Sequence, residues 1–119
     1  MTPLDSLRHQ TGQVEKKMVY YIYVLRSEKD GNFYTGYTFD LKKRMSEHNN
    51  GKVRSTSFRR PFSLVYFESC LNQQDALHRE KYLKTAWGKR YIKSRIKNYL
   101  LGQVSVDSKH QTGQGVKNG

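Results

Sequence analysis

Three short runs rich in β-branched and aromatic residues predict three β-strands, at 19–26, 33–38 and 62–68. Each run is bounded by polar or turn-forming residues. Asp30-Gly31-Asn32 is a turn signal between the first two runs. These two strands are therefore expected to form an antiparallel hairpin.

Three further segments have the pattern of helices. The first begins after Asp40, a predicted N-cap, and ends at Asn50-Gly51. The second begins with a capping-box pattern at Asn72 and runs to about Thr85, and the third, strongly basic, spans 88–100. The order β-β-α-β-α-α predicts an α+β domain with a three-stranded, mostly antiparallel sheet flanked by helices.

The folded domain is expected at 18–102, with flexible tails at 1–17 and 103–119. All 15 aromatic residues lie between Tyr20 and Tyr99, whereas both ends are rich in small polar residues. The chain has 119 residues and a formal net charge of +12. Residues 18–102 alone hold 17 Lys or Arg against seven Asp or Glu. The positive charge therefore belongs to the domain and indicates a polyanionic partner.

Hydropathy gives no sign of a membrane partner. The longest apolar run, 18–25, has eight residues, whereas a bilayer span needs ~20. It lacks the flanking features of a secretory signal. The single cysteine, Cys70, excludes an internal disulfide. A cytoplasmic location is expected, and a monomer is the default because nothing in the sequence fixes an oligomeric state.

Tyrosines and a glycine cluster on the predicted hairpin. Because side chains alternate across a strand, Tyr21 and Tyr23 share one face of the first strand. Tyr34 precedes Thr35-Gly36 in the second strand, where glycine lets a backbone or ligand approach closely. A tyrosine can stand in a sheet and still present its hydroxyl. Taken singly, each is expected to be an ordinary strand aromatic.

Arg44 and His48 are four residues apart on the first helix and project from one side. Leu41 and Met45, on the adjacent stripe, are expected to face the sheet. Arg44 and His48 are then expected at the border between core and solvent. Arginine binds phosphate with a rigid fork of donors, and histidine can donate to phosphate or exchange a proton near neutral pH. A solvated surface pair beside Glu47 is the alternative.

Glu80 falls on the apolar stripe of the second helix, at i+4 and i+3 from Ala76 and Leu77. A carboxylate there is expected to be paired or to bind a metal, because an isolated buried charge is costly. A salt bridge to Arg79 or Lys84 is one possibility. The other is Mg²⁺, which commonly uses one or two protein carboxylates together with water and phosphate oxygens.

Two basic segments, the loop 52–61 and the third helix, could hold a phosphodiester backbone. The candidate nucleic-acid contacts are Lys52, Arg54, Arg59, Arg60, Lys84, Lys89, Arg90 and Lys93. A generally basic solvated surface is the alternative. Three aromatic residues of this region could stack on bases but are expected in the core instead: Trp87, Tyr91 and Tyr99.

Together these residues resemble the GIY-YIG nuclease superfamily, and more closely its small stand-alone bacterial members, over about 19–97. Tyr21-Ile22-Tyr23 matches the GIY element, with Tyr21 in place of the glycine. Tyr34-Thr35-Gly36 matches YIG, with Thr35 in place of isoleucine. Arg44, His48 four residues later and Glu80 match the family's downstream arginine, histidine and metal-binding glutamate. Many members have an asparagine about twelve residues after that glutamate, where this chain has Ile92.

The resemblance implies a divalent-metal-dependent endonuclease that hydrolyses phosphodiester bonds in nucleic acid, with DNA as the expected substrate. Glu80 would hold one Mg²⁺ or Mn²⁺ ion and Tyr34 would be the general base. Tyr23 would orient the water or Tyr34, and Arg44 would clamp the scissile phosphate. His48 would bond a phosphate oxygen or relay a proton. A free phenol ionises near pH ~10, so a base of this type needs a positive field.

Two non-catalytic functions share the same surface charge. One is a basic nucleic-acid-binding module with a degenerate nuclease site. The other is a basic ribosome- or RNA-associated protein, which needs only the charge.

Overall fold

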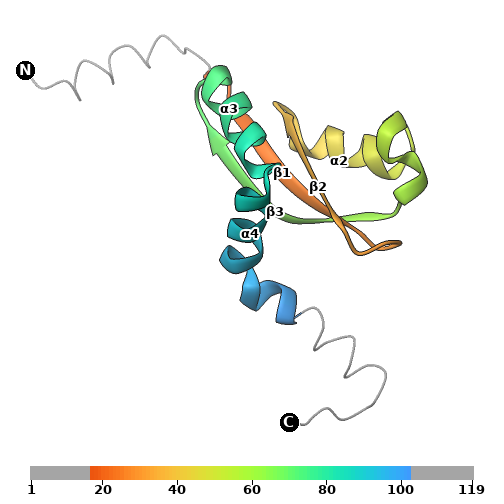
Figure 1. The fold of residues 1–119 in the computed structure, drawn as a ribbon. Coiled ribbons are helices and arrows are strands. Elements are labelled where there is room, and N and C mark those ends of the chain that lie inside the picture. Colours follow the sequence, from red (N-terminus) through yellow and green to blue (C-terminus); the bar gives the residue numbers. More distant parts are fainter. Residues whose placement is uncertain (1–16, 103–119) are drawn as a thin grey trace, which may run out of the picture.

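The computed structural model describes residues 17–102 (Figure 1). Its elements are β1 (Tyr20–Ser27), β2 (Phe33–Thr38), α2 (Leu41–Asn49), the 3-10 helix η1 (Arg54–Arg59), β3 (Phe62–Cys70), α3 (Gln73–Leu83) and α4 (Ala86–Arg95). Residues 97–102 form another helical segment. The predicted α+β class and element order are confirmed. Apart from Lys17, the predicted tails lie outside the described residues.

β1 is the central strand of the sheet, whose order is β2-β1-β3, and it pairs antiparallel with both neighbours. In the β1–β2 ladder Tyr23 lies opposite Gly36 and Leu25 opposite Tyr34. Because residues paired across a ladder share a face, all four occupy one face of the sheet. β2 is an edge strand of this sheet, and of its residues Thr35 and Gly36 are buried.

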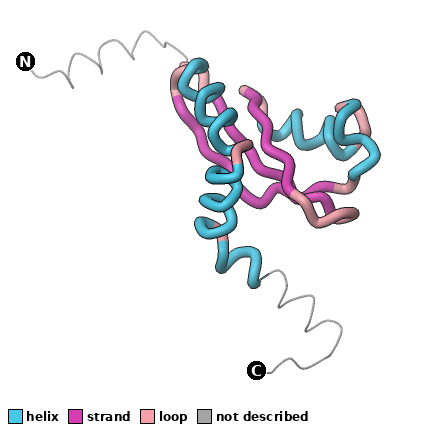
Figure 2. The backbone as a smooth tube through the Cα atoms, viewed as in Figure 1, coloured by secondary structure: helices cyan, strands magenta, loops and turns pink. Residues whose placement is uncertain are grey.

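Helices cover both faces of this sheet, with α2 on one face and α3 and α4 on the other (Figure 2). On the α3/α4 face, Ile22 and Val24 of β1 pack with Leu83 and Ile92. This arrangement buries the strand on both sides, which explains why β1 reads as an almost continuous apolar run.

On the α2 face, Tyr23 and Leu25 pack with Phe62, and Leu41 and Met45 lie against them. The expectation that Leu41 and Met45 face the sheet is confirmed. This second core is small, and polar groups of the candidate site adjoin it directly.

Side-chain caps fix where the helices begin. Asp40 accepts a hydrogen bond from the Lys43 amide, and Asn72 caps α3 in the same way. The Thr85 side chain caps α4. Consequently α4 begins at Ala86, two residues earlier than the sequence predicts.

Trp87, Tyr91 and Tyr99 are not in the core, contrary to the sequence expectation. Their exposed fractions are 69%, 39% and 47%. The buried stripe of this region instead carries Ile92 and Ile96. Tyr91 precedes Ile92 by one residue, so it lies about 100° further around the helix, away from the sheet.

A membrane span requires a helix that is both long and predominantly apolar. Within residues 17–102, no helix combines the length and apolar character that a membrane span requires.

Candidate active site

Gly36 makes room for Tyr23, its partner across the β1–β2 ladder. A Cβ atom at position 36 would overlap the Tyr23 hydroxyl and the ring carbon that carries it. Tyr23 is only 1% exposed, so its ring has no alternative place at the surface. The close approach expected at this glycine is therefore made by a side chain of the site itself.

A chain of hydrogen bonds links Tyr23 through His48 to Thr56. Tyr23 Oη lies 2.9 Å from His48 Nε2, and His48 Nδ1 lies 2.8 Å from Thr56 Oγ1. The Thr56 hydroxyl donates to the Val53 carbonyl at 3.4 Å. Its oxygen is then free to accept from His48 Nδ1–H, which leaves Nε2 to accept the Tyr23 O–H. The network thus selects the Nδ1–H tautomer of a neutral His48.

Burial keeps His48 uncharged. Its side chain is 0% exposed. Burial and the charge of Arg44 lower the pKa of His48 to about 4, although Glu47 acts in the opposite direction. His48 was expected at the border between core and solvent, and this is wrong. Thr56 of η1 and the Phe62 ring, 5.8 Å away between centroids, cover that side of the helix.

Tyr34 is the more accessible phenol of the site. Its ring centroid lies 5.1 Å from that of His48 and 6.5 Å from that of Tyr23, and its side chain is half-buried. Burial raises the pKa of Tyr23 to about 12, and the Arg44 guanidinium opposes that rise. Tyr23 is therefore held protonated at neutral pH, whereas Tyr34 reaches the solvent side.

Arg44 brings a guanidinium to the same place from α2. Its Nη1 donates to Glu47 Oε1 at 2.9 Å. Its Nε is buried and has no hydrogen-bond partner among residues 17–102. A cavity of about 370 Å³ opens beside Arg44. A guanidinium that lines a cavity and still has a donor unpaired in the fold is suited to bind an anionic oxygen.

Glu80 comes from α3, the helix on the other face of the sheet. Its side chain is 19% exposed, and its Oε2 lies 3.1 Å from Lys84 Nζ. The salt bridge to Lys84 predicted as one possibility is therefore present, whereas Arg79 pairs with Glu68. The Glu80 charge also adds to the raised pKa of Tyr23. The carboxylate thus lies within electrostatic reach of the Tyr23 hydroxyl.

The donors near Glu80 fit a cation that needs few protein ligands. Residues 17–102 contain no group of three or more His, Cys, Asp and Glu side chains that could hold a metal ion. Mg²⁺ retains several waters and is commonly bound by one or two carboxylates together with phosphate oxygens. A single half-buried carboxylate is compatible with this mode, and the Lys84 ion pair would have to open for it.

The predicted nucleic-acid contacts fall into two groups. Four are exposed and form no ion pair within the described part of the chain: Lys52, Arg54, Lys89 and Lys93. The others have partners in the fold: Arg59 with Asp30, Arg60 with the Ser57 carbonyl, Lys84 with Glu80 and Arg90 with the Trp87 ring. Lys93 also lies over an aromatic ring, that of Phe33, so Lys52, Arg54 and Lys89 are the freest to meet a phosphate.

Sequence reasoning gave Thr56 no role, yet its hydroxyl orients His48. No local pattern signals this contact, because it depends on how η1 folds back over α2. Ile92 is 1% exposed in the core. The place where many relatives have asparagine therefore contributes no amide to this site.

Residues 19–93 match a family model described as "GIY-YIG catalytic domain". A UPF0213 protein of Staphylococcus saprophyticus is 46% identical over 67 residues, which cover 56% of this chain and 80% of that protein. A UPF0213 protein of Pediococcus pentosaceus is 42% identical over 80 residues, covering 66% and 83%.

The solution NMR structure of a UPF0213 protein from Bacillus halodurans has 34% sequence identity and a TM-score of 0.43, and the match covers 65% of this chain and 84% of that one. The segment matched by the family model contains every residue of the cluster described above, from Tyr23 to Glu80. The chain belongs to the GIY-YIG catalytic domain family, as the tripeptides on its hairpin predict.

Proposed function

We propose that this protein is a divalent-metal-dependent endonuclease that hydrolyses phosphodiester bonds in nucleic acid, with DNA as the expected substrate. One observation carries the proposal. In a GIY-YIG domain, two phenols, a neutral imidazole and a guanidinium with an unpartnered donor converge, and a carboxylate lies within electrostatic reach.

Glu80 is the proposed ligand of one Mg²⁺ or Mn²⁺ ion. When bound, such an ion supplies positive charge that stabilises the phosphate and the leaving oxygen. The other proposed roles belong to side chains on the α2 face of the sheet.

Tyr34 is the proposed general base, which takes the proton of the attacking water. The difference between the two tyrosines supports this assignment, because burial raises the pKa of Tyr23 to about 12 while Tyr34 is accessible. Tyr23 orients the water or Tyr34. Arg44 holds the scissile phosphate with its guanidinium, which lines a cavity.

His48 is assigned to positioning Tyr23. Both of its ring nitrogens already have partners and the side chain is 0% exposed, so direct contact with a phosphate oxygen would require those bonds to break. The relay function remains compatible, because a neutral Nε2 can take a proton from the Tyr23 hydroxyl.

The test is nicking of a supercoiled plasmid in Mg²⁺ or Mn²⁺, against the same reaction in EDTA. Glu80→Ala is expected to abolish metal-dependent nicking and to leave binding of nucleic acid largely intact. Asp75→Ala, an exposed carboxylate on the same helix, is the matched control and should nick like the parent. Equal nicking by the Glu80 variant and the parent would refute the metal-ligand assignment.

A second candidate is a non-catalytic nucleic-acid-binding module. Two observations favour it: Ile92 is buried where many relatives carry asparagine, and Glu80 is paired with Lys84. This function predicts salt-sensitive binding to nucleic acid and no nicking in either metal, with the Glu80 and Asp75 variants both binding like the parent.

A further inference from the structure

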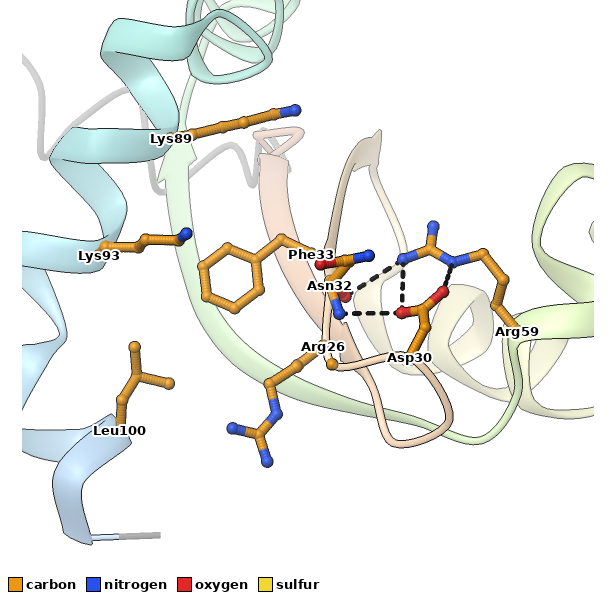
Figure 3. A pocket seen from close by; sticks show the side chains of 9 residues that line it. Arg26, Asp30, Asn32, Phe33, Arg59, Lys89, Lys93 and Leu100 are labelled. Carbon is orange, nitrogen blue, oxygen red and sulfur yellow. Dashed lines mark hydrogen bonds and ion pairs between the residues drawn. The ribbon is translucent and has the colours of Figure 1, made fainter. Parts of the chain in front are cut away.

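A basic pocket of about 650 Å³ lies on the α4 face of the sheet, away from the phenol cluster (Figure 3). Arg26 of β1 and Phe33 of β2, which are partners in the ladder, form its floor. Lys89, Lys93 and the nearby Leu100 form the side contributed by the α4 region. A pocket of this size can enclose a ligand as large as a nucleotide.

The cations of this pocket are largely unneutralised. Lys89 and Lys93 are exposed and have no carboxylate within ion-pair distance among residues 17–102. Arg26 lies 3.7 Å from Glu28, and its Nε is buried without a hydrogen-bond partner in the described part of the chain. The two lysine amino groups are therefore available to an anionic ligand.

The far side of the pocket is held together by hydrogen bonds. Arg59 donates to Asp30 at 2.8 Å through Nε and also to the Asn32 carbonyl at 3.2 Å. Figure 3 shows this hydrogen-bonded group opposite Lys93. Arg59 is therefore part of the pocket wall, and Lys89 and Lys93 are the cations left without an ion pair within residues 17–102 to contact a ligand.

Phe33 gives the pocket a flat apolar surface. Its ring is half-buried, and the Lys93 amino group is directed at it, 5.9 Å from the ring centroid. The Asn32 side-chain amide is exposed at the rim and has no hydrogen bond within residues 17–102. An aromatic face beside ammonium groups suits a base with an attached phosphate, because bases of every type stack on aromatic rings.

We propose that this pocket binds one unstacked nucleotide of a single strand, with its base against Phe33 and its phosphate near Lys89 and Lys93. This rests on the proposed function, because the strand is taken to be the polymer whose phosphate is cleaved at Tyr34. The pocket thereby selects single-stranded or branched substrates.

The position of the two sites on β2 explains that selection. Phe33 and Tyr34 are consecutive residues, so they face opposite sides of an edge strand. A polymer that occupies both sites must bend around β2. Duplex DNA is stiff, with a persistence length of about 150 bp, so a sharp turn costs a duplex a bending free energy that a flexible single strand does not require.

The experiment measures binding in EDTA, so that no cleavage is needed. Fluorescence anisotropy compares a labelled oligothymidylate with a blunt duplex of the same length. Lys89→Gln/Lys93→Gln is matched by Lys81→Gln/Lys97→Gln, which removes the same charge from exposed positions outside the pocket. Circular dichroism confirms that each variant is folded.

Relative to the control variant Lys81→Gln/Lys97→Gln, the pocket variant Lys89→Gln/Lys93→Gln is expected to bind the single strand at least about tenfold more weakly. Its binding of the duplex is expected to weaken less than about threefold. Phe33→Leu should weaken the single strand by about fivefold or more. If Phe33→Leu does not fold, the lysine pair still decides. The proposal would be overturned if the pocket and control variants lost the same affinity for the single strand. It would also be overturned if the pocket variant lost the same affinity for the single strand and for the duplex.

Thymidine monophosphate separates a strand site from a site for free nucleotide. Competition at millimolar concentration fits a subsite of a strand, and tighter binding of the mononucleotide than of the oligonucleotide would overturn this assignment. A pocket effect in a protein that nicks nothing would support the pocket and reject the nuclease function. If the protein nicks nucleic acid but the pocket and control lysine variants lose the same affinity for the single strand, the result would support the nuclease function and reject the pocket.

Discussion

Thr56→Val removes one hydroxyl from the Tyr23–His48–Thr56 chain and keeps the shape of the side chain. Both Thr56 and His48 are 0% exposed, so water cannot replace the lost acceptor without rearrangement. Whichever ring nitrogen carries the proton, His48 Nδ1 then lacks a partner, and a buried donor or acceptor left unsatisfied costs about 1–3 kcal/mol. With a urea slope of about 1–3 kcal/mol/M for a small protein, a loss of about 2 kcal/mol moves the unfolding midpoint by about 1 M.

Ser57→Ala is the control in the same 3-10 helix. Its hydroxyl donates to the Arg54 carbonyl at 3.3 Å in an exposed place, so the free energy of unfolding should change by less than about 0.5 kcal/mol. A Thr56→Val protein as stable as the Ser57→Ala protein would contradict the claim that the Thr56 hydroxyl supports His48.

The same variant can be followed in the imidazole itself by ¹⁵N NMR. The parent is expected to show the neutral Nδ1–H tautomer of His48, because Thr56 can accept from that nitrogen. In Thr56→Val the proton should move to Nε2, which reverses the hydrogen bond with Tyr23. An Nε2–H tautomer in the parent would show that the hydrogen bonds from Tyr23 to His48 and from His48 to Thr56 do not run in the direction given above.

Two further changes test the same cluster. Gly36→Ala should displace Tyr23, because the new Cβ would overlap its hydroxyl, and should lower stability by about 1–3 kcal/mol in a thermal melt; an unchanged melting temperature would contradict this contact. Folding lowers the pKa of His48 from 6.5 to about 4, so between these pH values the unfolded chain binds a proton that the folded protein does not. As the pH falls from 6.5 to 4, the free energy of unfolding should therefore decrease by up to about 3 kcal/mol. Urea unfolding at pH 7 and 4.5 measures this loss, and His48→Gln should lack it; an identical pH dependence in that variant would assign the effect to other groups.

Local features of the fold could be predicted because their causes lie close together in the sequence. The hairpin follows from two strand-forming runs around Asp30-Gly31-Asn32, and Asp40 and Asn72 cap helices as their sequence context indicates. The Glu80–Lys84 ion pair is an i,i+4 contact of the same kind.

Features that depend on distant segments could not be predicted. The depth of His48 is set by η1 and Phe62, which come later in the chain. The exposure of Trp87 depends on which stripe of α4 meets the sheet. The basic pocket joins Phe33 to α4, and no spacing in the sequence shows that these segments meet.

The proposed function depends on a cation site at Glu80, whose charge acts on the Tyr23 hydroxyl. Mn²⁺ titrated into ¹⁵N,¹³C-labelled protein tests it without cleavage, because the paramagnetic ion broadens the signals of nearby groups. The signals of Glu80, Tyr23 and Tyr34 should broaden first, and Glu80→Ala should abolish this effect. Broadening centred on Asp30 or Asp40, with Glu80 unaffected, would contradict the assignment of Glu80 as the metal ligand.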